Sequence, residues 1–382
     1  MKIKFFTLFL KSAFLILFIV NVNAEEQPSF YIPEAPAIAA KSYVLMDHNS
    51  GTILASNNEN EMRSPASLTK LMTSYVIFKR LKEEFITLDD EVKISEKAWR
   101  TGGSRSFIEV GKMIKLEDLL KGMIIQSGND ASVALAEHVA GSEGTFVLFM
   151  NDYAQQIGMI NSNFENASGL PHDNQYTTAK DMALLSSAMI REFPNYYNWY
   201  SQKEFTYNNI TQTNRNKLLF TDSTVDGLKT GWTEKAGYCL VTSANRVGMR
   251  LISVVMGSDS PSIRTAETEK LLDYGFRFFE TQSVNDISHQ VPVFKSKQAN
   301  IKVGVSDTSF LTLPRNQFKY TTQTINIMGD LVAPINQGEQ VGTLVISFSN
   351  KDIATLPLIA LEDATEAGFF TQMIDTIKLL FR

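Results

Sequence analysis

The chain has 382 residues, of which 44% are hydrophobic and 20% charged, and its formal net charge is −5. This is the composition of an ordinary globular protein, and the length suggests two domains. The acidic balance gives no support to nucleic acid as a partner. The single cysteine, Cys239, excludes an internal disulfide and is best explained as a small buried strand residue.

The first 24 residues predict a secretory signal peptide. Two early lysines precede an apolar stretch that is densest over residues 13–20, and the segment VNA (22–24) ends in a small residue before two glutamates. An uncleaved membrane anchor is the alternative, but the uninterrupted apolar run is short for a bilayer span. We therefore expect cleavage after Ala24 and export.

In the region that follows the signal peptide, strand patterns occur at the beginning and at the end, and helical patterns lie between them. Residues 42–47 and 52–56 flank the turn HNSG as a β-hairpin, and residues 238–257 form two strands around the turn NRVG. Helical periodicity predicts helices over residues 65–82, 116–126, 131–140, 144–157, 178–191 and 266–280. This order indicates an α+β domain over residues 25–282, built from an antiparallel β-sheet flanked by helices.

Short alternating stretches replace the helical patterns after residue 283. They cover residues 300–305, 309–314, 323–328, 342–348 and 354–361, and Gly, Pro, Asn and Asp punctuate them. We expect a small all-β domain over residues 283–365.

Residues 366–382 return to helical periodicity with one apolar face. That face carries Phe370, Met373, Ile374, Ile377, Leu380 and Phe381, and polar residues take the other side. Such a terminal amphipathic helix can lie in a membrane interface, or it can dock its apolar face on the β domain. The pattern alone leaves both alternatives open.

Several kinds of site are absent from the sequence. The four histidines form no metal-ligand spacing, and no G-x-S-x-G elbow, P-loop or dinucleotide fingerprint occurs. We therefore expect neither a metal nor a cofactor.

The segment SPASLTKLMT (64–73) carries the first candidate catalytic pair. Ser64 and Pro65 predict a helix start, yet Ser67 stands where a capping box has Glu or Gln, and Lys70 follows on the same helical face. A hydroxyl close to unpaired N–H groups suits a nucleophile, and a buried lysine with a lowered pKa can accept its proton. The motif S-x-x-K alone is weak, because it is common on solvated helices.

Two further polar motifs interrupt apolar segments. Ser127-Gly128-Asn129 breaks a helical run; a plain turn before an Asp130 cap is the simpler explanation. Lys229-Thr230-Gly231 leads into a strand whose edge could bind an extended peptide, although an edge lysine can also merely block strand pairing.

The combination is more specific than its parts. S-x-x-K, S-x-N and K-T-G follow one another 60 and then 102 residues apart, a set that resembles the penicilloyl serine transferases. The segments ASNNENEMRSPASLTKLMTSYV, IIQSGNDA, VDGLKTGWTEKAGY and LIALEDATEAGFF resemble the low-molecular-mass penicillin-binding proteins of the D-alanyl-D-alanine carboxypeptidase type. The resemblance covers essentially the whole mature chain.

This resemblance implies removal of the terminal D-Ala from the peptidoglycan pentapeptide stem. It implies Ser67 as nucleophile, Lys70 as its base and Ser127 as the proton relay to the leaving amine. The implied substrate-binding residues are Asn129, Lys229, Thr230, Gly231, Trp232 and Arg264, with Arg215 in a supporting place beneath the site. The backbone N–H groups of Ser67 and Trp232 would form the oxyanion hole.

The resemblance also implies partners and a location. β-Lactam antibiotics would acylate the same serine as covalent inhibitors. The residues 366–382 helix would attach the protein peripherally to the membrane surface, on the periplasmic face of the bacterial inner membrane.

Three alternatives remain open from the sequence. A serine β-lactamase of class A would need a glutamate in an E-x-x-L-N setting, which we do not find. A transpeptidase shares the acylation chemistry but transfers the acyl group to an amine. A non-catalytic cell-wall tether or β-lactam sensor is the alternative from the class of binding proteins.

Overall fold

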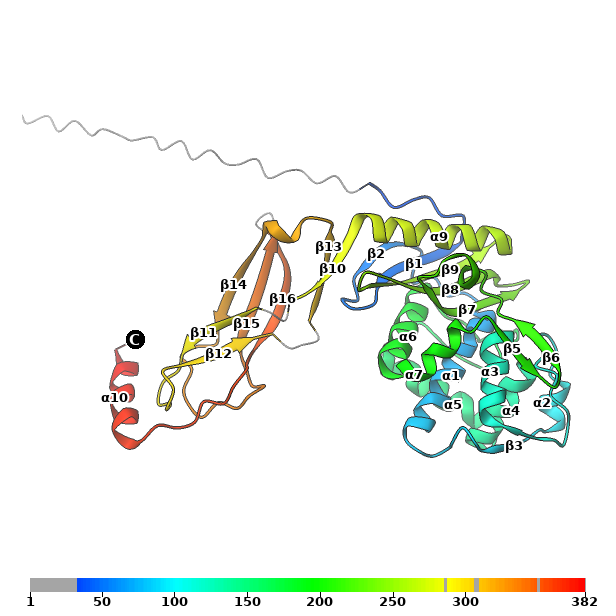
Figure 1. Cartoon of the computed structure of the whole chain (residues 1–382), viewed down its shortest axis with the longest axis horizontal. Coiled ribbons are helices and arrows are strands. Elements are labelled where there is room, and N and C mark those ends of the chain that lie inside the picture. The colour runs from blue at the N-terminus through cyan, green and yellow to red at the C-terminus, as the bar shows by residue number, and fades with distance from the viewer. Residues whose placement is uncertain (1–32, 285–286, 306–308, 349–350, 382) are drawn as a thin grey trace, which may run out of the picture. The chain divides into compact units, whose positions relative to one another are not determined.

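The computed structural model describes residues 33–284, 287–305, 309–348 and 351–381 (Figure 1). The predicted signal peptide lies outside these residues. Among the helices that are described, none combines the length and hydrophobicity that a bilayer span requires.

A five-stranded antiparallel sheet forms the centre of the first domain, in the order β2-β1-β9-β8-β7. Its strands are β1 (Ser42–Asp47), β2 (Ile53–Asn57), β7 (Val225–Thr233), β8 (Gly237–Arg246) and β9 (Met249–Ser258). The predicted hairpin and the turn between the last two strands are confirmed. Strand β7 lies at one edge of the sheet.

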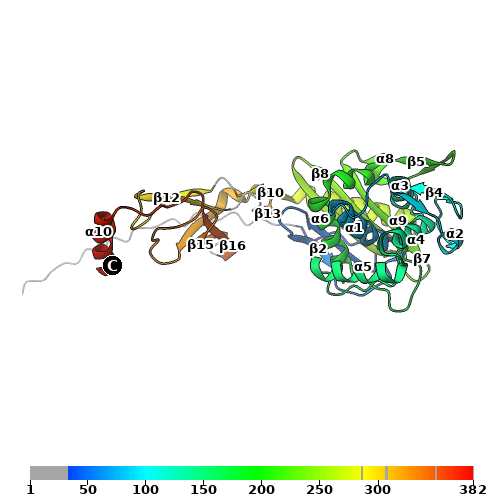
Figure 2. The same ribbon diagram turned by 90° about the horizontal axis from the view of Figure 1, so that it is seen from below.

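Helices cover both faces of this sheet (Figure 1). They are α1 (Thr69–Lys82), α2 (Glu96–Arg100), α3 (Leu116–Gln126), α4 (Asn129–Ala140), α5 (Glu143–Ile157), α6 (Ala179–Glu192), α7 (Pro194–Tyr197), α8 (Leu218–Thr221) and α9 (Pro261–Phe278). Helix α9 packs Leu271 and Leu272 against one face, beside Leu45 and Leu251. On the other face α1 contacts α3, α4, α5 and α6, which surround it in Figure 2.

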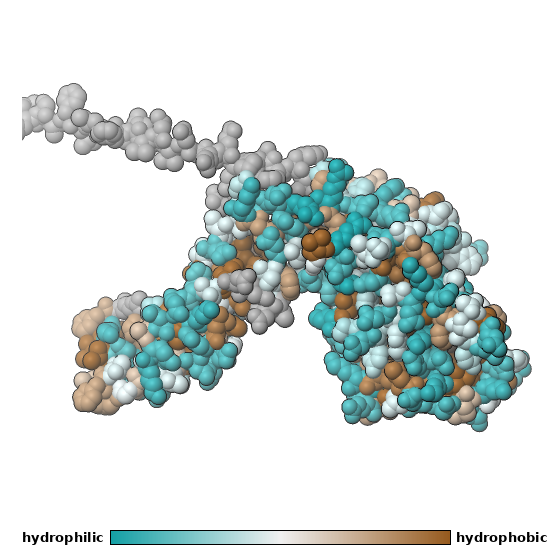
Figure 3. Space-filling model, in the orientation of Figure 1, coloured by the Kyte–Doolittle hydropathy of each residue, from teal (hydrophilic) through white to brown (hydrophobic). Residues whose placement is uncertain are grey.

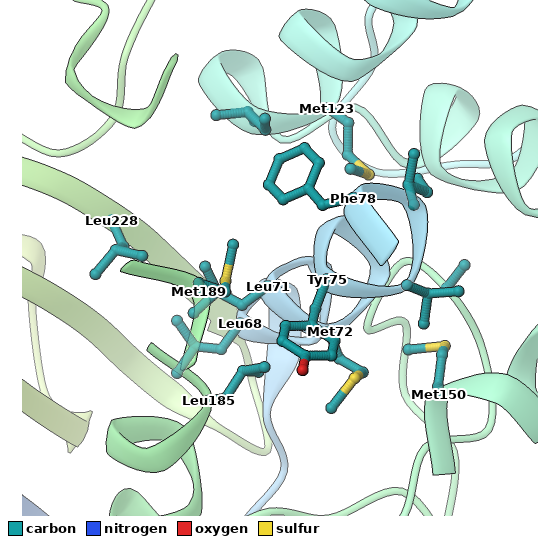
Figure 4. Close-up of a cluster of buried hydrophobic side chains, with 14 of the residues drawn as sticks. Leu68, Leu71, Met72, Tyr75, Phe78, Met123, Met150, Leu185, Met189 and Leu228 are labelled. Carbon is teal, nitrogen blue, oxygen red and sulfur yellow. The ribbon is translucent and has the colours of Figure 1, made fainter. Parts of the chain in front are cut away.

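Helix α1 is buried in the core, and several of its polar side chains are buried with it. Figure 4 shows Leu68, Leu71, Met72, Tyr75 and Phe78 packed among Met123, Met150, Leu185, Met189 and Leu228. Because neighbours enclose the helix on nearly all sides, Lys70 is only 1% exposed, and Thr73 and Ser74 are fully buried. Polar groups buried in this way must find partners inside the protein.

The start of this helix differs from the prediction. A short 3-10 turn, η1 (Ala66–Leu68), precedes α1, and neither element has a side-chain cap, so the expected Ser64 cap is wrong. The reason is Ala66, which takes a left-handed φ of +47° and turns the chain sharply before Ser67. Ser67 therefore lies on the turn that leads into α1, not in its first α-helical turn.

Most of the other predicted helices lie within two residues of their expected ends. Helix α9 is the exception, because it begins five residues before the predicted start at 266, with Ser260 as its N-cap and Pro261 in its first turn. The short helices α2, α7 and α8 of the first domain had no prediction. The same is true of four short strands and one short 3-10 helix: β3 (Glu91–Lys93), β4 (Met113–Lys115), β5 (Glu204–Tyr207), β6 (Ile210–Thr213) and η2 (Asn198–Ser201).

The C-terminal part is all-β, as predicted, and has its own core around Ile301, Val303, Leu344 and Leu358. Its five-stranded sheet has the order β11-β12-β16-β15-β14. The elements are β11 (Ser288–Pro292), β12 (Asn300–Gly304), η3 (Phe318–Tyr320), β14 (Thr321–Ile327), β15 (Gln340–Phe348) and β16 (Lys351–Ala360). Strand β13 (Phe310–Pro314) pairs with β10 (Phe279–Ser283), so the expected boundary at residue 282 falls within β10.

The last helix, α10 (Phe369–Leu380), leaves its apolar face in solvent. Phe370 is 76% and Leu380 77% exposed, and apolar side chains gather at this end of the chain in Figure 3. The contact with the β domain comes from the opposite face, where the buried Asp375 carboxylate accepts a hydrogen bond of 2.7 Å from the backbone N–H of Lys295. The alternative in which the apolar face docks on the β domain is therefore wrong.

Candidate active site

The three sequence motifs meet at one cavity of about 800 Å³. Ser67 reaches it from η1, Ser127 and Asn129 from the junction of α3 and α4, and Thr230 and Gly231 from β7. The other predicted residues that line it are Trp232, Arg264 and Arg215. The packing of α1 against the sheet and the helices thus brings together residues that are more than 150 positions apart in the sequence.

Lys70 lies behind Ser67 with its amino group surrounded by oxygen atoms. Its Nζ is 3.1 Å from Ser67 Oγ, 2.7 Å from Asn129 Oδ1 and 2.5 Å from the Ser168 carbonyl oxygen. Burial, the largest cause, and the positive charge of Arg215 lower the pKa of Lys70 to about 7, against the opposing effect of Asp130. Close to neutral pH a large fraction of this lysine is therefore an uncharged amine.

The geometry also orients that amine. A neutral amine has two N–H donors and one lone pair, and the oxygen atoms of Asn129 and Ser168 can only accept hydrogen bonds. If both N–H groups are given to these two acceptors, the lone pair remains for the third neighbour, Ser67 Oγ. The arrangement can therefore take a proton from the Ser67 hydroxyl.

Close backbone packing fixes the position of Ser67. Gly169, in the loop of residues 165–176, has a φ of +81°, and a Cβ built there would lie 1.8 Å from the Ala66 carbonyl oxygen. From the other side, a Cβ on Gly231 would meet the Pro65 oxygen at 3.2 Å. The turn that carries Ser67 is thus held between the loop and β7, at a spacing that only glycine allows on the loop side.

Ser127 points an unpaired hydroxyl into the site. It ends α3 in a left-handed conformation with a φ of +68°, and its buried Oγ has no hydrogen-bond partner among the described residues. Asn129 is held by Gly102 and Ser104, because its Nδ2 donates to the first carbonyl and its backbone N–H to the second, both at 2.7 Å. A buried hydroxyl without a partner is suited to a bound substrate that supplies one.

Strand β7 contributes a buried lysine and an open edge. Lys229 is 3% exposed and donates to the Thr230 carbonyl at 3.0 Å. Burial lowers the pKa of Lys229 well below its usual value, and the nearby charges of Lys70, Arg215 and Arg264 lower it further. No described strand pairs with the outer edge of β7, so an extended peptide can add there.

The two predicted arginines occupy different places. Arg264 is buried, and its guanidinium donates to the carbonyl oxygens of Gly231 at 3.2 Å and Cys239 at 3.3 Å, which braces β7 against β8. Arg215 also lines the cavity, with an exposed side chain, and its supporting place beneath the site stays a prediction. It follows Asn214, whose amide is buried, and this alternation turns the arginine outward.

An aromatic pair stands at the mouth of the cavity. The Trp232 indole is 56% exposed and lies 5.8 Å from the Tyr238 ring, centroid to centroid. Tyr238 in turn faces the Arg264 guanidinium at 5.7 Å. Sequence reasoning used only the backbone of Trp232 and missed Tyr238, although its place directly across the β7–β8 hairpin is readable from the turn.

The Ser168 carbonyl is the other contact that sequence reasoning missed. Every residue has a backbone carbonyl, so no sequence signal marks the one that meets Lys70. Metal chemistry has no candidate among the described residues, because no three His, Cys, Asp or Glu side chains are grouped to hold an ion.

Comparison with known proteins gives consistent matches along the chain. Residues 29–260 match the family described as D-alanyl-D-alanine carboxypeptidase, and residues 276–366 match the C-terminal domain of penicillin-binding protein 5. The D-alanyl-D-alanine carboxypeptidase DacC of Escherichia coli is 43% identical over 383 residues, covering 97% of this chain and 94% of that protein.

Solved structures agree with these matches. The crystal structure of penicillin-binding protein 5 from Haemophilus influenzae is similar with a TM-score of 0.82 and 42% identity, over 87% of this chain and 99% of that chain. Penicillin-binding protein D2 from Listeria monocytogenes, solved in its ampicillin-bound form, is 30% identical with a TM-score of 0.59, over 63% of this chain and 100% of that chain.

The packing of Gly169 gives a first test. We expect Gly169→Ala to lower the free energy of unfolding by about 2–4 kcal/mol, because the new Cβ clashes with the Ala66 carbonyl and the backbone is left-handed. Gly51→Ala is the matched control, since its φ is +72° but nothing lies within 4 Å, so it should cost only about 1 kcal/mol. Equal losses for the two variants in urea unfolding would contradict the proposed packing.

Proposed function

The chain belongs to the D-alanyl-D-alanine carboxypeptidase family, and we propose that it removes the terminal D-Ala from peptidoglycan pentapeptide stems through an acyl-enzyme on Ser67. The observation that carries this proposal is the buried amine of Lys70, 3.1 Å from the Ser67 hydroxyl. The comparisons do not favour a β-lactamase or a non-catalytic binding protein, because the matching family and the similar proteins are carboxypeptidases by name.

In the acylation step, the end of the stem peptide lies along the open edge of β7. Neutral Lys70 takes the proton of Ser67, and Ser67 Oγ attacks the carbonyl carbon between the two D-Ala residues. The backbone N–H groups of Ser67 and Trp232 stabilise the oxyanion. The C–N bond then breaks, and Ser127 gives its proton to the amine of the departing D-Ala and takes up in return the proton that Lys70 received from Ser67.

The arginines supply the charge that recognises the substrate carboxylate. Thr230 offers its hydroxyl, and Arg264 and Arg215 stay protonated although the partial loss of contact with water lowers the pKa of both. Lys229 acts as a hydrogen-bond donor at β7, where burial lowers its pKa well below the usual value. Asn129 has the further task of binding the substrate backbone.

Water completes the cycle by hydrolysing the acyl-enzyme, which releases the shortened stem and the free Ser67 hydroxyl. A β-lactam presents a strained amide to the same serine, and its ring opening leaves a covalent acyl group in place. The ampicillin complex of the Listeria relative supports this reactivity.

The proposed location rests on the predicted signal peptide and on helix α10. We propose that residues 1–24 direct export and are cleaved, that residues 25–282 form the catalytic domain and that residues 283–365 form the β domain. Residues 366–382 then attach the protein peripherally to the outer face of the inner membrane. The exposed apolar face of α10 and its polar contact through Asp375 support this attachment.

The central reaction is tested by release of D-alanine. The mature chain (residues 25–382) should release D-Ala from a pentapeptide ending in D-Ala-D-Ala and bind a fluorescent penicillin covalently. Ser67→Ala should abolish the covalent label and lower D-Ala release by at least about 10³-fold. Ser64→Ala, on the same segment, should keep both activities, and a folded wild-type chain that releases no D-Ala would contradict the proposal.

The pKa of Lys70 predicts the pH dependence. Lys70 acts as a base only when deprotonated, so acylation by penicillin should rise with pH through about 7 and level off above it. Below this point each pH unit should lower the rate by about tenfold, because the neutral fraction falls by that factor. Stopped-flow measurement of acylation between pH 5 and 9 checks the curve. A rate independent of pH from 5 to 7 would contradict the role of Lys70.

Membrane attachment is tested by sedimentation with vesicles of phosphatidylethanolamine and phosphatidylglycerol. The mature chain should co-sediment with them, and Ile374→Asp with Ile377→Asp should abolish binding because two charges enter the apolar face. Thr371→Asp with Gln372→Asp adds the same charge to the opposite face and should retain most of the binding. Equal loss in the two double variants would contradict attachment through the apolar face.

A further inference from the structure

We propose that Glu143, which lies outside the catalytic cavity, is a positioning residue that orients Lys70 through the loop of residues 165–176. The inference rests on the proposed function, since it assumes that Lys70 is the base that activates Ser67. It adds a residue from α5 that no sequence motif marks.

The need for positioning comes from Lys70 itself. Its amine can aim a lone pair at Ser67 only while its two N–H groups are held by Asn129 Oδ1 and the Ser168 carbonyl oxygen. Asn129 sits at the start of α4 and is rigidly supported. The Ser168 carbonyl belongs to a loop, so its place depends on what holds the loop.

Two side chains pin the neighbouring residue, Ala167, at both ends of its backbone. Glu143 Oε1 accepts a hydrogen bond from the Ala167 N–H at 3.1 Å, and Thr73 Oγ1 donates to the Ala167 carbonyl at 2.7 Å. Thr73 lies one helical turn after Lys70 on α1. The two peptide groups that flank Ala167, just before the Ser168 carbonyl, are thus held by α5 on one side and by α1 on the other.

The Glu143 carboxylate is well placed for this role. It is the first residue of α5, where the helix dipole favours a negative charge. Its other oxygen accepts from Lys97 Nζ at 2.7 Å, and the Glu143 side chain is 13% exposed while that of Lys97 is 59% exposed. A charged acceptor strengthens the bond to the Ala167 N–H, whereas the exposed ion pair to Lys97 contributes little.

Loss of the acceptor at position 143 should therefore lower the rate of the covalent step and leave the affinity for the ligand nearly unchanged. Without it no side chain holds the Ala167 N–H, and although Asn166 Oδ1 still accepts from the Ser168 N–H at 3.2 Å, the Ser168 carbonyl moves relative to Lys70. A displacement of about 1 Å near a reacting group can cost about 100-fold in rate. The cavity walls that bind the ligand contain neither Glu143 nor Ala167, so ligand affinity should remain.

The test measures penicillin acylation by stopped flow, with the rate constant of the covalent step separated from the dissociation constant of the preceding complex. Glu143→Ala should lower the covalent rate constant by about 10- to 100-fold and leave the dissociation constant nearly unchanged. Glu143→Gln should recover most of the rate, because its amide oxygen can still accept from Ala167. Lys97→Met should acylate like the wild type.

A matched control separates positioning from general destabilisation. Glu192 is another partly buried carboxylate, bound to Lys79 and to the Tyr75 hydroxyl at 3.0 Å each, but it has no bond to the loop. Glu192→Ala should lower the melting temperature at least as much as Glu143→Ala while it keeps the wild-type covalent rate constant.

Several outcomes would overturn the inference. Wild-type acylation in Glu143→Ala, no recovery in Glu143→Gln, or an equal rate loss in Glu192→Ala would each remove the positioning role and leave the proposed function intact. A wild-type chain that neither releases D-Ala nor is acylated would overturn the proposed function, and the role of Glu143 with it.

Discussion

The site depends on one enclosed amino group. Lys70 is 1% exposed because α1 is packed on nearly all sides, and burial is the largest cause of its lowered pKa. In water the same lysine would be an ammonium ion and could not accept a proton from Ser67. The hydrophobic core around α1 is therefore part of the chemistry, since it keeps a basic amine partly neutral at the pH at which the protein works.

The surrounding elements convert that amine into an oriented base. The 3-10 turn begins at the left-handed Ala66 and lies between Gly169 and Gly231, which sets the distance from Ser67 to Lys70. The α3–α4 junction supplies an acceptor through Asn129, and the loop supplies a second through Ser168. Three segments that are distant in sequence must pack together before the pair can work, so folding and activity are closely coupled.

Sequence patterns predicted this arrangement in part. The resemblance carried by the three motifs predicted one shared site, and Ser67, Ser127 and Thr230 line one cavity. The periodicity of residues 116–126 matched α3 at both ends. The left-handed turn at Ala66 could not be predicted, because alanine rarely takes this conformation and nothing nearby signals it. The face of α10 that contacts the β domain could not be predicted either. The contact is made by the buried Asp375, and helical periodicity does not reveal a tertiary hydrogen bond.

The most direct test of this account is a measurement of the Lys70 pKa in the free enzyme. NMR titration of the lysine Cε resonances, with Lys70 identified by the signal missing from Lys70→Met, reports the charge of its amino group without any substrate. The account predicts a midpoint at about 7. A midpoint close to the ordinary lysine value of about 10.4 would contradict it, because Lys70 would then be charged when Ser67 has to lose its proton.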